Sequence, residues 1–233
     1  MEKLVYVLWR RPDVAATELR DALLGPVLAR LRAGGARRPA VNVVDDAVAD
    51  VLRSRITRLD PPPDAMLSFW MECCDDRGAC EAALSEVAAR APGYLVVESV
   101  PLVNTTRVAP PGERTPGVNV VALIQRPERI AWGDWIAHWH GPHKRVALET
   151  QCSYAYVRNT VVRLLHEGAP PWAGIVEEGF PAEAVTNPML WYKAEGDPQT
   201  LKRNLARMLE SCRAFLDLDR VESHPMSEYR LAD

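Results

Sequence analysis

The sequence predicts an α+β fold in which one pattern of strands and helices occurs twice. Apolar runs rich in β-branched and aromatic residues are typical of buried strands, and they follow one another in similar order in both halves. Several short segments of the first half have counterparts in the second at nearly constant spacing, which indicates an internal repeat.

The two halves open and close alike. Residues 3–12 read KLVYVLWRRP and residues 118–127 read VNVVALIQRP, each a strand-like run that ends at a turn proline. A helical stretch follows in both, interrupted at Gly25-Pro26 and at Gly141-Pro142, an offset of 116 residues. The halves end in VESVPL and VESHPM. With Trp70-Met71-Glu72 and Ile175-Val176-Glu177 as an intermediate pair, four pairs follow in the same order, which favours a repeat over chance.

Each half is expected to contain a strand, a helix, two strands, a helix and a strand, which is the split βαβ or ferredoxin-like motif. The elements expected in the first half are residues 3–9, 14–33, 39–45, 66–73, 77–90 and 94–103. Those expected in the second half are residues 118–125, 131–148, 153–165, 173–179, 198–215 and 219–230. Residues 1–106 therefore form one predicted repeat and residues 117–233 the other, with a proline-rich linker over 107–116.

Both helices of such a repeat cover the same face of its sheet, so the other face needs a cover as well. Runs such as LVYVLW and VVALI are apolar on both sides, as in strands buried on both faces. We therefore expect the two repeats to pack sheet to sheet and to enclose a barrel-like space. A cavity between the sheets would be a natural ligand site.

Composition narrows the class of protein. A formal net charge of −3 gives no electrostatic reason to expect nucleic acid or an anionic membrane as a partner. Five cysteines without metal-ligand or disulfide spacing indicate reduced thiols. We see neither a signal pattern nor a membrane-spanning run, so a cytoplasmic location is expected, with a small molecule as ligand and a homo-oligomer possible. Nucleotide-binding and common hydrolase motifs are absent.

His140 is the candidate catalytic residue. It lies where Gly141-Pro142 is expected to kink or break the helix, and there it could satisfy freed backbone groups or act as a general acid/base. The first repeat has Leu24 at this position, so the fold itself does not require an imidazole there. His143 and His138 nearby allow a metal site to be considered, but no cysteine or carboxylate at ligand spacing completes it, and we expect none.

The candidate substrate-binding residues lie on the same helix and on the strands that follow. Trp135 and Trp139 share a helical stripe, which is typical of core packing as well as of an aromatic site wall. Neighbouring residues of a strand point to opposite faces, so at most one of Glu177 and Glu178 can face the cavity. His224, which replaces Val100 of the first repeat, faces either the cavity or solvent. The full predicted set is Trp135, Trp139, Tyr156, Asn159, Glu177, Glu178 and His224.

The second half resembles the EthD family of dimeric α/β-barrel proteins. The family pattern has aromatic residues before His-x-Pro and a later Tyr-Val-x-Asn strand, and here Trp132, Trp135, His140-Gly-Pro142 and Tyr156-Val-Arg-Asn159 match it. GIVEEGF, residues 174–180, resembles the family's later strand with its acidic residue. This chain departs from the family in being a fused tandem, with no matching histidine in its first half.

The resemblance implies a cofactor-independent acid/base enzyme of the lyase or cyclase type that acts on a small, apolar, oxygenated or aromatic polyketide-like molecule. In that role His140 would transfer the proton, while Tyr156, Asn159 and a glutamate would orient the substrate. The alternative is a non-catalytic protein that binds a hydrophobic metabolite or haem, since related barrels hold haem through a histidine.

Overall fold

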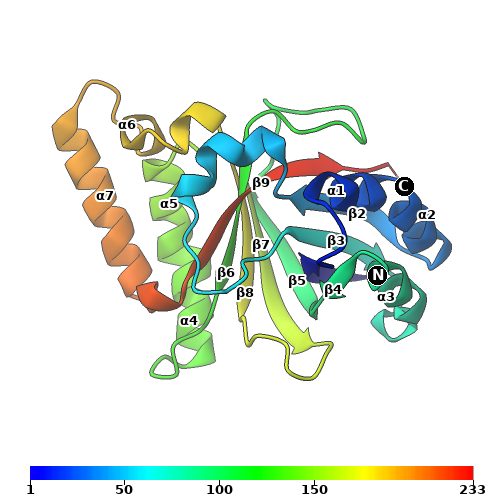
Figure 1. The fold of residues 1–233 in the computed structure, drawn as a ribbon. Coiled ribbons are helices and arrows are strands. Elements are labelled where there is room, and N and C mark those ends of the chain that lie inside the picture. The colour runs from blue at the N-terminus through cyan, green and yellow to red at the C-terminus, as the bar shows by residue number, and fades with distance from the viewer. Residues whose placement is uncertain (233) are drawn as a thin grey trace.

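The computed structural model describes residues 1–232, and a single antiparallel sheet organises them (Figure 1). Its nine strands in the described residues are β1 (Glu2–Arg10), β2 (Arg37–Val43), β3 (Ala65–Met71), β4 (Ala88–Arg90), β5 (Gly93–Leu102), β6 (Val118–Ile124), β7 (Ala155–Leu164), β8 (Gly174–Phe180) and β9 (Glu222–Arg230). The α-helices are α1 (Ala16–Leu24), α2 (Pro26–Ala33), α3 (Gly78–Leu84), α4 (Trp132–His138), α5 (Lys144–Thr150), α6 (Pro188–Trp191) and α7 (Pro198–Arg213).

Eight of these strands close into an antiparallel barrel. Hydrogen-bonded neighbours follow the order β3-β2-β9-β6-β8-β7-β5-β1, and β1 also pairs with β3, which closes the ring; β4 extends one end of β1. The first half of the chain contributes β2-β3-β1-β5 and the second contributes β7-β8-β6-β9. In each half the order is second, third, first and fourth barrel strand, so both halves use the same internal order. The halves join through the β2–β9 and β5–β7 pairs.

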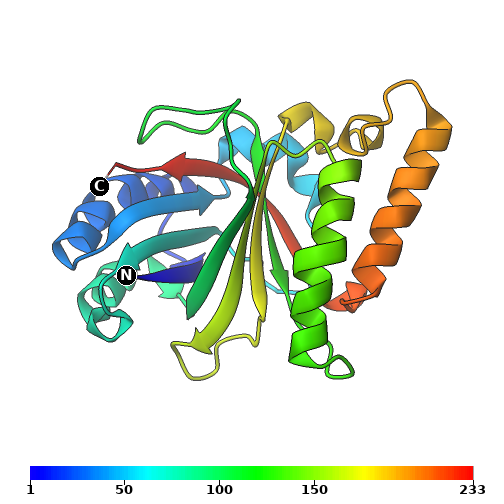
Figure 2. The ribbon, with the colours of Figure 1, turned by 180° about the vertical axis from the view of Figure 1, so that it is seen from behind.

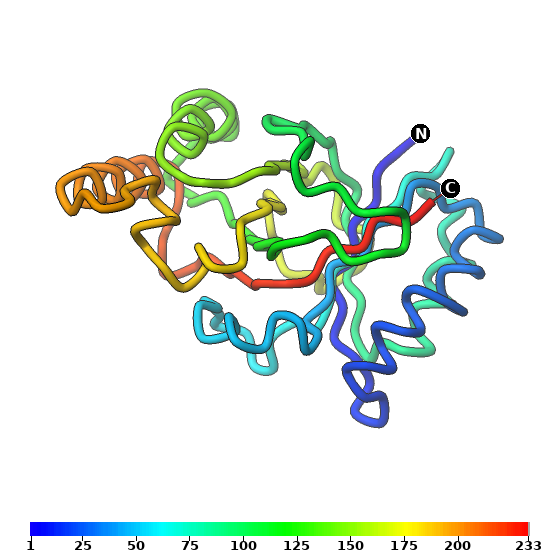
Figure 3. Tube along the Cα trace, turned by 90° about the horizontal axis from the view of Figure 1, so that it is seen from above, coloured from blue at the N-terminus to red at the C-terminus, as the bar shows by residue number. Residues whose placement is uncertain are grey.

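Strands are apolar on both faces because both faces are covered. On β1, Leu4, Tyr6 and Leu8 pack into an outer core with α1, α2 and α3, while Val5 and Val7 point into the barrel. In the second half α4, α5 and α7 cover the outer face, with Trp135 and Trp139 buried beneath them. The helices of the two halves lie on opposite sides of the barrel (Figures 2 and 3).

The middle of the barrel is filled rather than hollow. Its packed residues come from both halves and include Val5, Val7, Met66, Tyr94, Val121, Leu123, Ile175 and Met226. The expected space between the sheets is therefore confined to the barrel ends, because large apolar side chains meet across the centre. Polar residues occupy those ends.

Of the two expected outcomes at Gly141-Pro142, a kink or a break, the break is wrong: the helix continues through an irregular turn. Residues Trp139–His143 form one π-helical turn between α4 and α5. Proline lacks the N–H that an α-helix interior needs, and a wider turn accommodates it without ending the helix. The helix carrying His140 is therefore one continuous element, called the bent helix below because of this irregular turn.

Three further features differ from the sequence-based expectation. The helix expected over residues 77–90 ends at Leu84, and β4 follows because Arg90 pairs with Trp9 of β1 and lies 4.4 Å over its ring. A 3₁₀ segment, Asp46–Ser54, was not anticipated; its Val48 and Val51 pack on Val118. The linker is partly ordered along β9, where the Thr115 hydroxyl donates to Glu228. Within residues 1–232 no helix is both long and apolar enough to cross a membrane.

Candidate functional site

The sheet divides the predicted site residues into two groups. Tyr156 stands opposite Glu178 across β7 and β8, and Val157 stands opposite Glu177. Because side chains alternate along a strand, each pair occupies one face of the sheet. Trp135, Trp139, His140, Tyr156 and Glu178 lie on the helix side, whereas Asn159, Glu177 and His224 point into the barrel.

The tryptophans form the wall between the bent helix and the sheet. Trp135 and Trp139 are buried with ring centroids 4.9 Å apart. Trp139 lies so close to β8 that a Cβ on Gly174 would come within 2.5 Å of its ring. The core-packing interpretation therefore holds for both, although the Trp135 indole Nε1 is buried without a hydrogen-bond partner.

His140 is half-buried beside this wall. Its Nε2 lies 3.3 Å from the Thr160 hydroxyl, and its ring meets Trp139 edge-on. Burial, with Arg158 and Lys144 nearby, lowers the pKa of His140 to about 4, so the imidazole is neutral at pH 7. A neutral imidazole with so low a pKa is a weak base.

The neighbouring histidines hold the bent helix to α7. His138 Nε2 lies 3.1 Å from the Ser211 carbonyl, and His143 Nδ1 lies 3.0 Å from the Ser211 hydroxyl. Over residues 1–232 no cluster of three or more histidine, cysteine or acidic side chains has a metal-binding arrangement.

Glu178 is the group on the helix side whose pKa lies near neutral pH. Its Oε1 is buried without a hydrogen-bond partner, and burial raises the pKa of this carboxyl to about 7. Tyr156, also buried, stands opposite on β7, and burial raises the pKa of its phenol. Glu178 therefore changes charge near neutral pH in an aromatic setting.

An apolar cavity adjoins Glu178. It has a volume of about 290 Å³ and lies between the 3₁₀ segment, α6 and the outer face of β6 and β9, with Ile56, Val120, Val185, Trp191, Tyr192 and Pro225 among its lining residues. Val120 is the register partner of Glu178 on β6. Directly opposite side chains stand about 5 Å apart, so Glu178 lies next to Val120 of the cavity wall without itself lining the cavity.

On the barrel side, Asn159 and Glu177 form a hydrogen-bonded network with Asn42 and Lys3. The Asn42 and Asn159 amides donate to Glu177 at 3.1 and 3.0 Å. Lys3 Nζ donates to Asn159 Oδ1 at 2.8 Å and lies 3.7 Å from Glu177. Sequence reasoning missed Lys3 and Asn42. The signal available for Lys3 was its place on the inward face of β1, two residues before Val5.

His224 lies on the same inward face of the sheet, level with Glu177, since Val121 of β6 is the register partner of both. It is fully buried, and neither ring nitrogen has a hydrogen-bond partner; Glu222 Oε2 is 3.4 Å from its Nε2. Burial and Arg55 lower the pKa of His224 to about 3. The side chain therefore faces the interior and not solvent.

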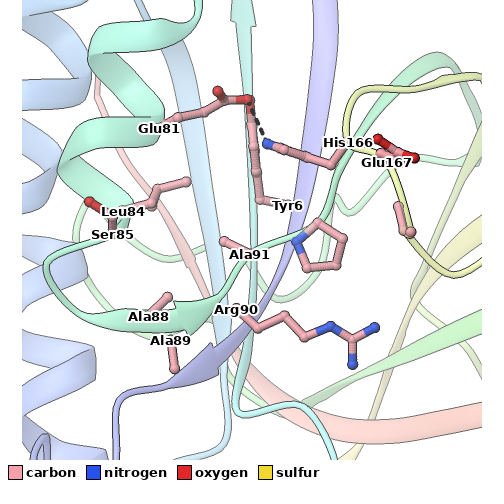
Figure 4. A pocket seen from close by; sticks show the side chains of 13 residues that line it. Tyr6, Glu81, Leu84, Ser85, Ala88, Ala89, Arg90, Ala91, His166 and Glu167 are labelled. Atoms are coloured by element: carbon pink, nitrogen blue, oxygen red, sulfur yellow. Dashed lines mark hydrogen bonds and ion pairs between the residues drawn. The ribbon is translucent and has the colours of Figure 1, made fainter.

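A further cluster, Tyr6, Glu81 and His166, was not foreseen (Figure 4). These residues border a cavity of about 390 Å³ between α3, β4 and the loop after β7. The Tyr6 hydroxyl donates to Glu81 Oε1 at 3.1 Å, His166 Nε2 lies 3.1 Å from the same oxygen, and His166 Nδ1 accepts from the Gly93 N–H. Both nitrogens of His166 are thus engaged, so it ties the loop to the first half. It lies in the loop between β7 and β8, and no sequence pattern marked it.

Comparison with known proteins defines the class of fold. No protein-family model and no curated protein matches this chain. Among solved structures, an anthrone oxidase-like protein aligns with a TM-score of 0.58 at 10% identity, covering 100% of this chain and 93% of that one. A candidate monooxygenase from Lactobacillus acidophilus NCFM gives 0.50 at 9% identity, covering 99% and 95%, and one from Fusobacterium nucleatum gives 0.50 at 8%, covering 99% and 92%.

These proteins share the fold of this chain, an α/β barrel built on a closed antiparallel sheet. Since the alignments span nearly the whole of each chain, the likeness extends to the complete barrel. At such low identity it concerns the fold alone.

Proposed function

We propose that this chain is a cofactor-independent acid/base enzyme, of the lyase or cyclase type, acting on a small apolar oxygenated molecule, and that it is an EthD-like tandem. Residues 1–106 and 117–233 would be its two ferredoxin-like repeats, joined by residues 107–116. The identical strand order of the halves supports the repeat. The observation that carries the function is Glu178, a carboxyl with a pKa of about 7 beside an apolar cavity.

The roles differ from those suggested by the sequence alone. Glu178 would transfer the proton, because its pKa matches neutral pH whereas the pKa of His140 is about 4. The substrate would lie against Val120, Trp191 and Tyr192. His140 would position the site through Thr160 and the bent helix.

The step that fits these groups is proton abstraction from carbon next to a carbonyl. The Glu178 carboxylate takes the proton, and the electron pair of the C–H bond moves to the carbonyl oxygen to give an enolate. Return of the proton at another position, or loss of a leaving group from the adjacent carbon, completes an isomerisation or elimination. No oxidant is consumed.

Hydrogen–deuterium exchange tests this step directly. Anthrone is a suitable first probe because a structural neighbour is described as anthrone oxidase-like, and 1-tetralone and 2-acetylphenol extend the panel. Each is incubated anaerobically in D₂O, and NMR follows loss of the C10 methylene protons of anthrone, which are conjugated with its carbonyl through the aromatic rings, or of the protons next to the carbonyl in the other two probes. We expect protein-dependent exchange that rises with pH through about 7 and then levels off as Glu178 ionises.

Variants assign the exchange to Glu178. Glu178→Gln should lower the rate about a hundredfold or more, as expected for loss of a general base. Glu183→Gln, which alters an exposed carboxylate near the cavity rim, should leave it unchanged. His140→Leu, the residue of the first repeat, should fold and retain part of the exchange. Equal rates for Glu178→Gln and the unmodified protein, or no exchange with any probe, would contradict the proposal.

The second candidate is a binding protein without chemistry, which the same apolar cavity favours. Probe binding without exchange above the buffer rate would support it.

Haem fits less well: an axial histidine needs a free nitrogen facing a flat apolar slot. His140 directs Nε2 at Thr160, Trp139 fills the space against β8, and His224 is enclosed in the barrel. The residues present do not fit haem.

A further inference from the structure

One mouth of the barrel holds two adjoining cavities that share a wall. The inner cavity, about 250 Å³, is lined by Lys3, Ser68, Trp70 and Glu177 among others. The outer cavity, about 280 Å³, lies under the linker and is lined by Val100, Leu102, Val103, Val108 and Ala155 among others. Arg38, Glu98, Val157 and Arg230 line both. The mouth is thus charged on one side and apolar on the other, with two arginines between.

Three acidic side chains at this mouth, Glu98, Glu177 and Glu228, are already neutralised by protein groups, whereas Glu113, which lines the outer cavity, is exposed. Glu98 Oε2 lies 2.5 Å from Lys3 Nζ. Glu177 accepts from two asparagine amides and lies beside the same ammonium group. Glu228 accepts from Thr115 and Arg230. These three carboxylates therefore offer little to a cationic ligand.

Arg230 retains hydrogen-bonding capacity. Its Nε and Nη2 bond Glu228 Oε1 at 3.0 and 2.9 Å, and its side chain is 58% exposed. A guanidinium carries five N–H donors in a planar fork, so Arg230 can bond a second acceptor beside Glu228. Arg230 borders both cavities.

Arg38 reaches the same wall through unusual backbone geometry. Its φ of 49° lies in the left-handed region, which is costly for a residue with a Cβ, and the register of β2 against β3 shifts between Arg37 and Ala40. The guanidinium lies 5.6 Å from the centre of the Trp70 ring. Strained residues of this kind gather at ligand sites, where the strain aims a side chain.

The outer cavity offers an apolar surface next to these arginines. Val100, Val103 and Val108 are 44%, 62% and 70% exposed, although each is a large hydrophobic residue. Exposed apolar groups that gather beside a cavity indicate a binding surface more than scattered ones do.

We propose that this mouth binds an amphipathic monocarboxylate, with its carboxylate between Arg38 and Arg230 and its hydrocarbon in the outer cavity. Guanidinium forks match carboxylate and phosphate alike, but three nearby glutamates disfavour a second negative charge, so a monoanion fits better. The site opens into the barrel mouth, away from the helix-side cavity beside Glu178, and does not depend on the proposed enzymatic function.

Calorimetry with octanoate, octan-1-ol and octyl phosphate tests the proposal on the full chain. We expect octanoate to bind at least tenfold more tightly than the alcohol or the phosphate, and more weakly as salt is raised. Arg230→Gln should weaken octanoate at least tenfold. Arg145→Gln, an exposed arginine on α5, serves as the matched control and should change nothing.

Arg38→Gly separates binding from folding. Glycine adopts a positive φ without strain, so this variant should melt at the same or a higher temperature, yet lose octanoate affinity at least tenfold. Val103→Asp, in the outer cavity, should also weaken octanoate. The proposal would be overturned if octanoate did not bind, or if Arg230→Gln and Arg38→Gly bound it as tightly as the unmodified protein. It would also be overturned if octan-1-ol bound as tightly as octanoate, or octyl phosphate more tightly.

Discussion

Several buried polar residues of this protein lack the partners that burial normally demands, and His224 is the extreme case. Both its nitrogens are unpartnered in the barrel interior. Such a group lowers stability, because it has lost its water without gaining a hydrogen bond; the typical cost is about 1–3 kcal/mol. Its neutral state also makes stability depend on pH.

We predict that His224→Leu stabilises the protein, and more so in acid. The pKa of His224 is about 3 in the folded protein, against an ordinary value of 6.5. Below pH 6.5 His224 is therefore protonated in the unfolded chain but stays neutral in the folded protein, which favours unfolding. The unmodified protein should therefore lose stability from pH 6.5 downward, and the variant should lose less. Urea unfolding at pH 7.5 and pH 5 measures this.

His166→Gln is the matched comparison, because both nitrogens of His166 have partners and its loss should destabilise at neutral pH. If His224→Leu were no more stable than the parent at pH 5, the burial argument for His224 would be wrong.

Strand alternation correctly predicted that Glu177 and Glu178 face opposite ways. Which face the helices cover could not be read from a pattern of period two, because both faces are apolar. The predicted residues were therefore treated as one site, whereas they occupy two. Lys3 and Asn42 escaped notice because their partners lie on strands distant in sequence.

At the level of elements, the bent helix can pack closely on β8 only because residue 174 is a glycine. Trp139 packs on Gly174 of β8, with no room between them for a methyl group. Since the π-helical turn fixes where Trp139 sits, the helix and strand cannot easily separate to make room. His140 moves with this turn.

We predict that Gly174→Ala destabilises the protein by about 1–3 kcal/mol, the usual cost of overpacking a core. Gly133→Ala is the control: Gly133 lies in α4 with nothing within 4 Å of an added Cβ, and alanine there should stabilise by about 0.5–1 kcal/mol. Chemical unfolding of both variants measures the difference. Gly174→Ala with unchanged stability would show that the helix can shift away from β8.

The sequence predicted the barrel strands within a few residues because apolar β-branched runs bounded by turns are strong signals. The β2–β9 and β5–β7 pairs that close the barrel were not foreseen, since pairing between halves leaves no local periodicity. The π-helical turn was missed because a Gly-Pro pair ordinarily ends a helix.

At the scale of the whole molecule, the halves should depend on each other. Made separately, residues 1–106 and 117–233 would each lose the cross-half strand pairs and expose the apolar barrel interior. We predict that each is insoluble or self-associates, and that co-expression yields a compact one-to-one complex. Size-exclusion chromatography with light scattering distinguishes these states; two monomeric halves that unfold cooperatively would refute mutual dependence.

The ends of the chain meet at the barrel mouth, where Lys3 and Leu231 line the same cavity (Figure 3). A short peptide between them would convert the chain into a closed loop, and the loop could then be reopened between Asn104 and Ala109 without breaking any strand pair. Such a circular permutant would place the second half first and keep every ladder of the barrel. The barrel therefore does not dictate which half is made first.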